Sequence, residues 1–570
     1  MFDPNQPPNP EQDLSEKFTQ KIEAEQSLEF LNELQETFPE LEIYLVGGLV
    51  RDTIIDHPSP KDYDFIARGV SPEDLISKLN ELGRCDLTGR NFGVIKFRPN
   101  NCTFEGDEQF IDIAFPRKDQ SEGTGGYKDF KAQVDPHLTI EDDLARRDFT
   151  INALAWDVKN KKLIDEFDGL TDLKAGKIRA VGNPKERFQE DYSRMLRGLR
   201  FASKLDFQID RETWQAITEL MPRINDEREI LKTKVIERKL ALTTTDEAKE
   251  KLEEQLQHQI DSNLEETILE RVTPIETISK EFLKALQSNP ALAMELFDKS
   301  GAFEQLMPEV LEMKDCEQPE KFHSEGDVWT HTRLMLQKIN SPEFQQQFPD
   351  AKITGEFVLG VLLHDIGKPT TQELDESTTP PSIHFYGHAE EGVAITQSIA
   401  KKLKLKKEDA EKLTFLTKNH MFGMTTPDVN QIGANKFARK FIDSPHSQDL
   451  LMLFYLDSLC SIKPDGSSPM KNINDTLQRV EEIKEIRANQ PQKIVDGSQV
   501  IKILETKTGP FIGCIILLLS ELKDRGVINS SEQAKKFLSD FKSILKTFES
   551  KITPSNREEM VVTIISELNL

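Results

Sequence analysis

The most constraining stretch of this chain runs from residue 46 to residue 65 and reads VGGLVRDTIIDHPSPKDYDF. It follows EIYLV, whose composition is typical of a buried strand. Gly47 and Gly48 predict a turn into a helix, where backbone N–H groups can approach a phosphate. Asp62 and Asp64 are two residues apart, which places both carboxylates on one face of a strand. The fold therefore has to place a turn that can bind a phosphate close to a pair of carboxylates.

Paired carboxylates at this spacing predict a metal site, because two like charges this close repel unless a cation lies between them. Oxygen ligands suit Mg²⁺, which also accepts substrate phosphate oxygens. Asp112 in FIDIAF is the candidate third ligand, since a lone charge among apolar neighbours is costly. Asp62, Asp64 and Asp112 are the predicted catalytic residues of a two-metal phosphoryl transfer. Arg51 follows the glycine turn and could contact the phosphate groups of a nucleoside triphosphate bound there.

The charge of the chain is unevenly distributed. The formal net charge is −26, which repels a polyanion at long range. Residues 174–204 nevertheless contain nine basic and three acidic side chains, a local balance of +6. A basic segment in an acidic chain indicates a site that contacts phosphate.

Within that segment, residues 190–204 predict an amphipathic helix with a basic face. Asp191 and Arg194 are three residues apart, so they are predicted to be neighbours on one helix face. A carboxylate can accept from the exocyclic amine of cytosine or adenine, and a guanidinium can donate to the adjacent ring nitrogen. The alternative is an ordinary surface ion pair, which is disfavoured because no neighbouring glutamate appears to neutralise the arginines at 194, 197 and 200. The pair is therefore predicted to select C or A without a template.

A second cluster consists of histidines. Six of the ten histidines lie within 98 residues, namely His323, His331, His364, His384, His388 and His420. VLLHDIGKP places His364 beside Asp365, with His331 upstream and Asp457 downstream. A single buried histidine is more often a core residue, but clustering of imidazole and carboxylate groups indicates a divalent metal other than structural zinc.

Five segments together resemble the class II tRNA nucleotidyltransferase and poly(A) polymerase family of the DNA polymerase β superfamily. They are LVGGLVRD, KDYDF, RRDFTINALAWD, EDYSRMLRGLRFA and LHDIGK, and they span roughly residues 40–465. The resemblance implies that Gly48 and Arg51 contact the nucleotide and that Arg147 helps to hold ATP or CTP, oriented by Asp148. It assigns base selection to Asp191, Arg194, Arg197 and Arg200. SKEFL, at 279–283, departs from the family pattern because Phe282 replaces an expected arginine.

The order H…HD…D also resembles the HD metal-dependent phosphohydrolase domain carried by some bacterial members of this family. This resemblance implies that His388 and His420 add ligands for a second ion and that Lys368 contacts phosphate. The metal is expected to be a divalent transition metal or Mg²⁺. Substrates of such domains are phosphomonoesters or 2′,3′-cyclic phosphates. His323 and His384 have weaker claims as ligands.

The predicted fold class is an α+β, polymerase β-like nucleotidyltransferase domain followed by mostly α-helical neck, HD and tail domains. The predicted boundaries are a disordered lead-in at 1–25, the catalytic domain at 26–160, a nucleotide-selecting neck at 161–315, the HD domain at 316–465 and an RNA-binding tail at 466–570. The Glu-rich insertion at 226–271 is expected to form a helical hairpin or short coiled coil.

The predicted function is addition of C and/or A (CCA) to the 3′ end of tRNA from CTP and ATP, with Mg²⁺. CC-only, A-only and poly(A) addition remain open alternatives. A different hypothesis is an HD phosphohydrolase whose N-terminal half only binds RNA. The longest apolar run is too short to span a membrane, and the five scattered cysteines do not suggest disulfides. A cytoplasmic location and no membrane partner are expected.

Overall fold

The computed structural model describes residues 10–58, 62–88, 93–104, 109–121, 125–126, 130–243, 246–261, 266–379, 381–422, 432, 434–489, 495–554 and 556–568. The chain divides into two compact units, Met1–Thr476 and Leu477–Leu570. The finer boundaries expected within the first unit stay predictions. Among the helices of the described ranges, none is long and apolar enough to cross a membrane.

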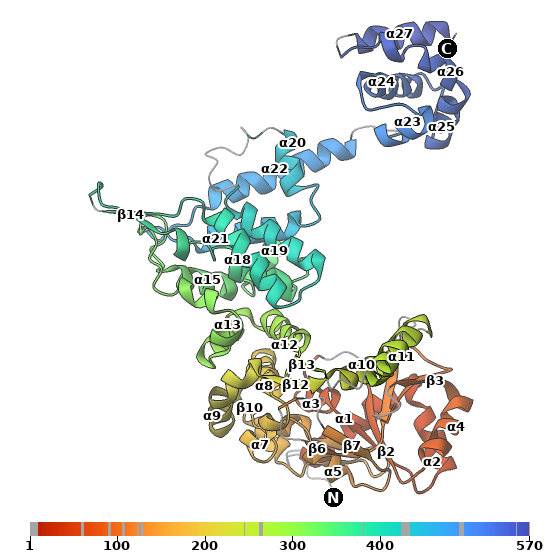
Figure 1. The fold of residues 1–570 in the computed structure, drawn as a ribbon, viewed down its shortest axis with the longest axis vertical. Coiled ribbons are helices and arrows are strands. Elements are labelled where there is room, and N and C mark those ends of the chain that lie inside the picture. Colours follow the sequence, from red (N-terminus) through yellow and green to blue (C-terminus); the bar gives the residue numbers. More distant parts are fainter. Residues whose placement is uncertain are drawn as a thin grey trace, which may run out of the picture. The chain divides into compact units, whose positions relative to one another are not determined.

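A seven-stranded mixed sheet organises the N-terminal part of the first unit, in the order β3-β4-β5-β2-β1-β8-β9 (Figure 1). Its strands are β1 (Glu42–Val46), β2 (Asp64–Arg68), β3 (Gly83–Thr88), β4 (Val94–Pro99), β5 (Ile111–Ala114), β8 (Ala155–Asp157) and β9 (Lys162–Ile164). β2 and β5 are parallel neighbours, and the other pairs are antiparallel. The N-terminal helices are α1 (Pro10–Glu23), α2 (Phe30–Thr37), α3 (Gly48–Ile54), α4 (Pro72–Leu82) and α5 (Ile140–Ala145), and β6 (Arg117–Ser121) pairs with β7 (Phe130–Val134).

The sheet is anchored by alternating apolar residues on its central strands. Tyr44 and Val46 of β1 and Ile66 of β2 form one buried cluster with Ile140 and Leu144 of helix α5. Residues two apart on a strand share a face, so this cluster uses one side of β1. A capping box at Thr139 and Asp142 starts α5 at the right place for this contact.

The N-terminal segment differs from the expected disordered lead-in, because residues 10–23 form helix α1. Phe18 is completely buried, and its ring stacks on Trp156 of β8 with 4.7 Å between centroids. Lys17 forms an ion pair of 2.9 Å with Asp56. The polar composition of the segment predicted disorder, but its one fully buried aromatic residue, Phe18, stabilises the helix through its contact with Trp156.

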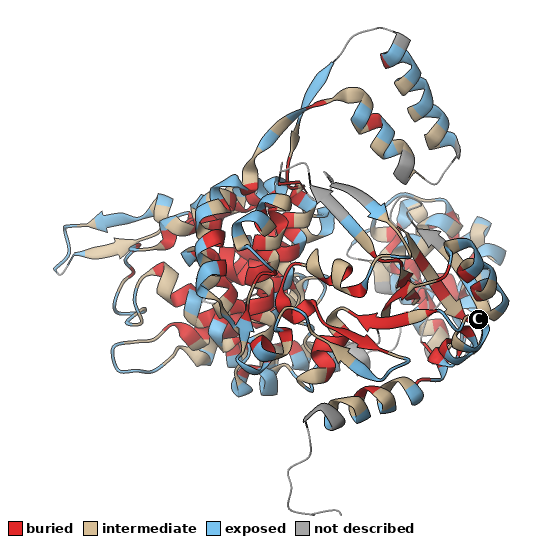
Figure 2. Ribbon diagram, turned by 90° about the horizontal axis from the view of Figure 1, so that it is seen from below, coloured by how far each residue is buried: buried red, intermediate tan, exposed pale blue. Residues whose placement is uncertain are grey.

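The inserted segment at 226–271 is a helical hairpin, as expected, but it stands on a two-stranded ribbon that was not expected. Helices α10 (Lys232–Leu242) and α11 (Asp246–Asp261) pack together between strands β12 (Glu227–Leu231) and β13 (Thr267–Arg271). Arg228 lies opposite Glu270 in the ribbon and forms a 3.1 Å ion pair with it. The cross-strand partner, 42 residues away, outweighs the helical propensity of these charged residues. Figure 2 shows most of this insertion as intermediate or exposed.

The remainder of the first unit is mostly helical, which confirms the predicted fold class. The neck contains α6 (Gly169–Lys174), β10 (Lys177–Ile178), α7 (Pro184–Glu190), α8 (Ser193–Leu205), β11 (Gln208–Ile209), α9 (Arg211–Leu220), α12 (Ile275–Ser288), α13 (Pro290–Lys299) and α14 (Ala302–Leu306). The histidine-rich region contains α15 (Val328–Lys338), α16 (Pro342–Gln347), α17 (Gly355–Leu363), β14 (Glu373–Asp375), β15 (Ser382–His384), α18 (His388–Lys402), α19 (Lys407–Asn419), α20 (Ala434–Phe441) and α21 (Ser447–Cys460). α15, α17, α18, α19 and α21 pack on one another, and Figure 1 shows α15, α18, α19 and α21 close together.

Helix α22 (Met470–Asn489) runs across the division between the two units. The second unit has its own buried core, in which Val500, Leu504, Ile515, Leu518 and Ile564 take part. Its helices are α23 (Gly497–Leu504), α24 (Pro510–Asp524), α25 (Ser531–Asp540), α26 (Lys542–Lys546) and α27 (Arg557–Glu567). A separate core of this kind is what an independently packed domain needs.

The docking of α1 generates the first prediction. Phe18→Ala removes a buried aromatic ring, and we expect the free energy of unfolding to fall by about 3 kcal/mol. The emission of Trp156 should shift as its stacked partner is lost, which urea titration followed by fluorescence would detect. Gln20→Ala, at an exposed position of the same helix, should stay within about 0.5 kcal/mol of wild type. Equal stability of all three proteins would contradict the docking.

Candidate functional sites

Two of the predicted catalytic aspartates face each other across the parallel pair of strands. Asp64 begins β2 and is the register partner of Asp112 on β5, while Lys96 of β4 contacts Asp112 at 2.9 Å. Asp62 lies just before the strand and is exposed. Burial, together with the charges of Asp62 and Asp112, raises the pKa of Asp64 to about 7. A half-buried carboxyl group whose ionised form is disfavoured by two neighbouring acids fits a divalent cation.

The glycine turn contacts this carboxylate group directly. Gly47 has a φ of +81°, and a Cβ at this position would lie 2.9 Å from the Oδ2 atom of Asp64. A side chain is therefore excluded both by the backbone conformation and by the acid. Gly47 precedes α3, and Gly48 is its first residue. β1 thus delivers the turn and β2 delivers Asp64 at the same end of the antiparallel pair, where Val46 is the partner of Asp64.

Arg51 lies in a buried pair. Its guanidinium contacts Asp52 at 2.6 Å and donates to the Oδ1 atom of Asn152 at 2.8 Å, and only 3% of the side chain is exposed. These contacts tie α3 to the segment that follows the RRD sequence. The predicted contact of Arg51 with a triphosphate stays a prediction, as does the role of Gly48.

The RRD segment is held by an acid that the sequence analysis missed. Asp143 of α5 is completely buried and pairs with Arg146 at 2.7 Å and with Arg147 at 3.3 Å. The expectation that Asp148 orients Arg147 is wrong, because Asp148 instead pairs with Arg197 of α8 at 2.7 Å. The run of acids in EDDLARRD was the available signal, since residues three and four apart on a helix are neighbours.

The base-selecting pair has a different local geometry from the one predicted. α8 begins at Ser193, and Asp191 is an extended residue between α7 and α8, so Asp191 and Arg194 do not share a helix face. Asp191 accepts a hydrogen bond from the backbone N–H of Ser193 at 2.9 Å, and burial raises the pKa of its carboxyl group. Arg194 pairs with Glu190 at 2.6 Å.

The arginines of α8 are also neutralised, contrary to the expectation from their sequence neighbours. Arg200 donates to Glu281 of α12, and Arg197 lies between Asp148 and Glu281. Phe201 lies under the guanidinium groups of Arg51, Arg197 and Arg200, at 5.2, 5.4 and 4.2 Å from the ring centroid. Glu281 is the acid of SKEFL, and its partners are 81 and 84 residues away, so local sequence could not reveal them.

Among the described residues, three groups of side chains each have ligand atoms within 4.8 Å of one another, and two of these groups contain the predicted ligands. One contains His331, His364 and Asp457, and the other contains Asp365, His388 and His420. All six side chains are buried. The Oδ2 atom of Asp365 lies 3.1 Å from the Nε2 atom of His364, and its Oδ1 atom lies 3.3 Å from that of His420. Asp365 therefore lies between the two groups and can serve both.

The hydrogen bonds of the imidazoles define which nitrogen faces the cluster. The Nδ1 atoms of His364, His388 and His420 lie 2.7–2.8 Å from backbone carbonyl oxygens, which places the proton on Nδ1. The Nε2 atoms of His388 and His420 consequently face each other, 3.1 Å apart, as lone-pair donors. The buried Nε2 atom of His364 has no hydrogen-bond partner among the described residues. This donor set fits divalent metal ions.

Glu325 is a further residue of this centre that the sequence analysis did not name. It accepts hydrogen bonds from the Nδ1 atoms of His331, at 2.8 Å, and His323, at 2.7 Å, and from the backbone N–H of Ile462. Burial alone would raise the pKa of Glu325, but the bonds from the two imidazoles lower it to about 2. Glu325 is therefore a carboxylate that fixes the orientation of His331, and His323 belongs to this support rather than to the ligand groups around Asp365.

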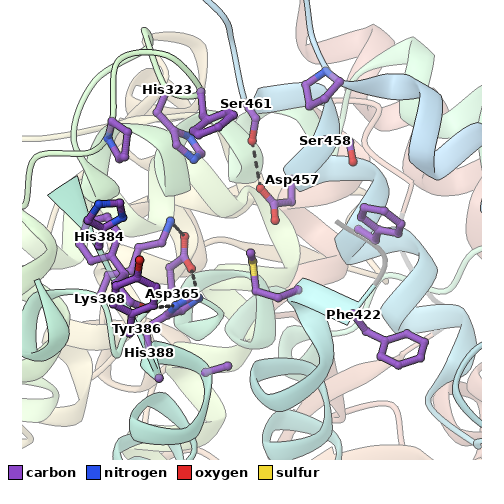
Figure 3. A pocket seen from close by; sticks show the side chains of 18 of the residues that line it. His323, Asp365, Lys368, His384, Tyr386, His388, Phe422, Asp457, Ser458 and Ser461 are labelled. Atoms are coloured by element: carbon purple, nitrogen blue, oxygen red, sulfur yellow. Dashed lines mark hydrogen bonds and ion pairs between the residues drawn. The ribbon is translucent and has the colours of Figure 1, made fainter. Parts of the chain in front are cut away.

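A cavity of about 830 Å³ opens beside these ligands (Figure 3). Its lining includes Asp365, His388 and Asp457 together with Lys368. Lys368 contacts Asp365 at 2.7 Å and Gln318 at 2.7 Å. A buried ammonium group beside a ligand cluster is placed to meet a phosphate oxygen.

A mixed sheet with facing aspartates and a glycine turn, followed by helices with an HD ligand cluster, defines a nucleotidyltransferase joined to an HD domain. Two family models match the chain, the Poly A polymerase head domain at residues 43–179 and the HD domain at residues 331–449. The Multifunctional CCA protein of Pasteurella multocida is 30% identical over 371 residues, which covers 64% of this chain and 70% of that protein. The chain belongs to the CCA-adding enzyme and poly(A) polymerase family, as the sequence motifs predicted.

Other proteins are also similar to this chain. The Multifunctional CCA protein of Mannheimia succiniciproducens is 29% identical over 67% of this chain and 74% of that protein. Poly(A) polymerase I of Haemophilus influenzae is 36% identical over 32% of this chain and 40% of that protein. Among solved structures, the Bacillus stearothermophilus CCA-adding enzyme in complex with CTP has a TM-score of 0.48 at 16% identity, covering 94% of this chain and 99% of that chain.

The pair of Asp148 and Arg197 generates a stability prediction. Burial alone would raise the pKa of Asp148, but the charge of Arg197 and the hydrogen bond from Asn152 lower it from 3.8 to about 2. A depressed carboxyl pKa stabilises the fold above pH 4, and this stabilisation is lost as the pH falls towards 2.

We therefore expect Asp148→Asn to lower the free energy of unfolding by about 2 kcal/mol at pH 7. The difference from wild type should shrink below pH 4. Urea titrations at pH 7, 5 and 3.5 would measure it, with Asp56→Asn as a control because Asp56 is 75% exposed. A difference that does not change with pH would contradict the ionised pair.

Proposed function

We propose that this chain adds C and/or A to the 3′ end of tRNA, using CTP and ATP as donors. The placement of Asp64 opposite Asp112, with the Gly47 turn against the Oδ2 atom of Asp64, is the observation that supports it. Family membership favours the same reaction class. Poly(A) addition by the same site is the alternative within the family.

In the proposed reaction, the terminal 3′-hydroxyl group gives up its proton to water, and its oxygen forms a bond with the α-phosphorus of the nucleotide. The bond between that phosphorus and its bridging oxygen breaks, and pyrophosphate leaves. Asp62, Asp64 and Asp112 would hold Mg²⁺, which supplies activation of the attacking oxygen and stabilisation of the leaving one. Lys96 holds Asp112 in place, and the Gly47 turn leaves room beside Asp64 for the triphosphate.

Base selection is assigned to Asp191 and Arg194. The carboxylate of Asp191 would accept from the exocyclic amine of C or A, and Arg194 would donate to the neighbouring ring nitrogen. Because Arg194 pairs with Glu190 and donates to the backbone carbonyl of Arg187 at 3.1 Å, its orientation is fixed before a nucleotide arrives. Arg197 and Arg200, which pair with acids from other elements, support helix α8, which carries Arg194.

A second activity is proposed for the HD cluster, namely hydrolysis of phosphate esters. His331, His364, Asp365 and Asp457 would hold one divalent ion, and Asp365, His388 and His420 a second. Such ions supply Lewis-acid activation of water. In the hydrolysis of a 2′,3′-cyclic phosphate, the water oxygen bonds to phosphorus, one ring P–O bond breaks, and the departing ribose oxygen takes up a proton. Lys368 would bind a phosphate oxygen.

The hypothesis that the N-terminal half only binds RNA is disfavoured by its carboxylates. A half-buried acid whose neighbours raise its pKa is costly to retain, and Asp64 has both Asp62 and Asp112 as neighbours. The second unit is proposed to contact the body of tRNA, and a cytoplasmic location stays a prediction.

The proposal is tested by incubating the purified chain with tRNA transcripts that end before, within and at the end of CCA, with CTP and ATP separately and together. Asp64→Ala should lower nucleotide addition by at least about 10³-fold while leaving hydrolysis of a cyclic phosphate intact, because one metal carboxylate is lost. His364→Ala should have the reverse effect. No addition to any transcript by the wild type with Mg²⁺ would refute the nucleotidyltransferase assignment.

Base selection is tested by misincorporation. Asp191→Asn keeps an oxygen for the N–H of Ser193 but removes the negative charge, so we expect discrimination of CTP and ATP against UTP and GTP to fall about 10-fold or more. Single-turnover addition with each of the four nucleotides would measure it. Glu186→Ala, at an exposed position of the preceding helix, should discriminate like the wild type. Unchanged discrimination in Asp191→Asn would exclude a role for this carboxylate in selection.

A further inference from the structure

One wall of the HD cavity carries aromatic rings that packing does not explain. Tyr386 lines the cavity, yet its side chain is 72% exposed. Its ring stacks on the ring of His384, with centroids 5.2 Å apart and planes 14° apart. Since His384 covers one face and most of the ring remains exposed, the other face of Tyr386 is open. Phe322, 52% exposed, lines the same cavity.

The ribbon formed by β14 and β15 holds this pair of rings in place. His384 is the last residue of β15 and is the register partner of Glu373 on β14. The Nε2 atom of His384 lies 3.0 Å from the hydroxyl oxygen of Ser382, so this contact fixes the ring plane on which Tyr386 rests. A stacked pair fixed in this way is a preformed surface for a third planar group, because little freedom is lost when it binds.

The rings lie close to the ligand cluster along the chain. Tyr386 is separated from His388 by Gly387 alone, so their Cα atoms are at most about 7 Å apart. In Figure 3, Tyr386 and His384 lie on the same side of the cavity as Lys368 and Asp365. Lys418 and Lys463 also line the cavity. An open aromatic face, the buried lysine Lys368 and the His/Asp ligand groups therefore share one cavity.

The geometry points to a nucleobase as the planar group, so that Tyr386, supported by His384, makes the HD site selective for phosphate esters of nucleosides over esters without a base. This inference rests on the proposed phosphoesterase activity of the same site. Stacking uses the face of a base rather than its hydrogen-bonding edge, so every base is accepted.

The test compares two substrates that carry the same reacting group, a ribose 2,3-cyclic phosphate. One is adenosine 2′,3′-cyclic phosphate, and the other is methyl β-ribofuranoside 2,3-cyclic phosphate, which lacks the base. Wild-type full-length chain should have the lower KM for the nucleotide. Tyr386→Ala should raise that KM on the order of 10-fold, with kcat within about 2-fold, and should leave the base-free substrate unchanged.

Two further variants separate stacking from structural damage. Tyr386→Phe keeps the ring and should behave like the wild type. Leu374→Ala removes another exposed side chain, 59% exposed, from strand β14 of the same ribbon and should leave both substrates unchanged. An equal effect of Tyr386→Ala on both substrates, or no effect on either, would overturn the inference.

Binding distinguishes a failure of this inference from a failure of the proposed activity. Calorimetric titration with adenosine 2′-phosphate and with ribose 5-phosphate does not depend on turnover. If the wild type hydrolyses neither substrate, the phosphoesterase proposal is refuted. In that case, tighter binding of adenosine 2′-phosphate than of ribose 5-phosphate, lost in Tyr386→Ala, still supports stacking. Equal affinity of both compounds would refute stacking whether or not hydrolysis occurs.

Discussion

The structure depends on two clusters that hold like-charged or lone-pair groups close together, although Lys96 pairs with one acid of the first cluster and Lys368 with one acid of the second. At the sheet, parallel pairing of β2 and β5 places Asp64 opposite Asp112. In the helical region, the Nε2 atoms of His388 and His420 face each other at 3.1 Å. Such arrangements are unfavourable for a protein by itself and become favourable when a divalent ion binds. Two unrelated folds in one chain thus solve the same problem with different donors, oxygen in one and mainly nitrogen in the other.

Helix α8 differs from these clusters, because the positive charges of its arginines are balanced by acids of the protein itself. Asp148 comes from the segment after α5 and Glu281 from α12, and together they occupy Arg197 and Arg200. Bidentate and shared contacts of this kind fix planar guanidinium groups in defined orientations. A residue that reads a base edge needs such a rigid support, since misplacement weakens both of its hydrogen bonds. The acidic partners of α8 therefore indicate its function better than its net charge does.

The sequence predicted what short spacing determines and missed what tertiary contact determines. The order of glycines and aspartates at 47–64, the HD pair and the grouping of His331 and Asp457 with it could be predicted because each motif carries its own chemistry. Asp143 and Glu325 were missed because their role is defined by the side chains that they hold. Helix α1 was missed because Phe18 has meaning only beside Trp156, 138 residues away. The ribbon under the insertion was missed for the same reason.

Helix α12 connects the two candidate sites physically. On one side, Glu281 holds Arg200 of α8. On the other side, α12 packs on α17, the helix that ends just before His364. A Cβ at Gly355 would lie 2.4 Å from the backbone oxygen of Leu283, so only glycine permits this approach. Ser279 donates to the carbonyl oxygen of Leu403 at 2.6 Å and adds a second attachment. Because one helix contacts both neighbours, α12 supports helix α8 of the first site and the helix that precedes His364 of the second.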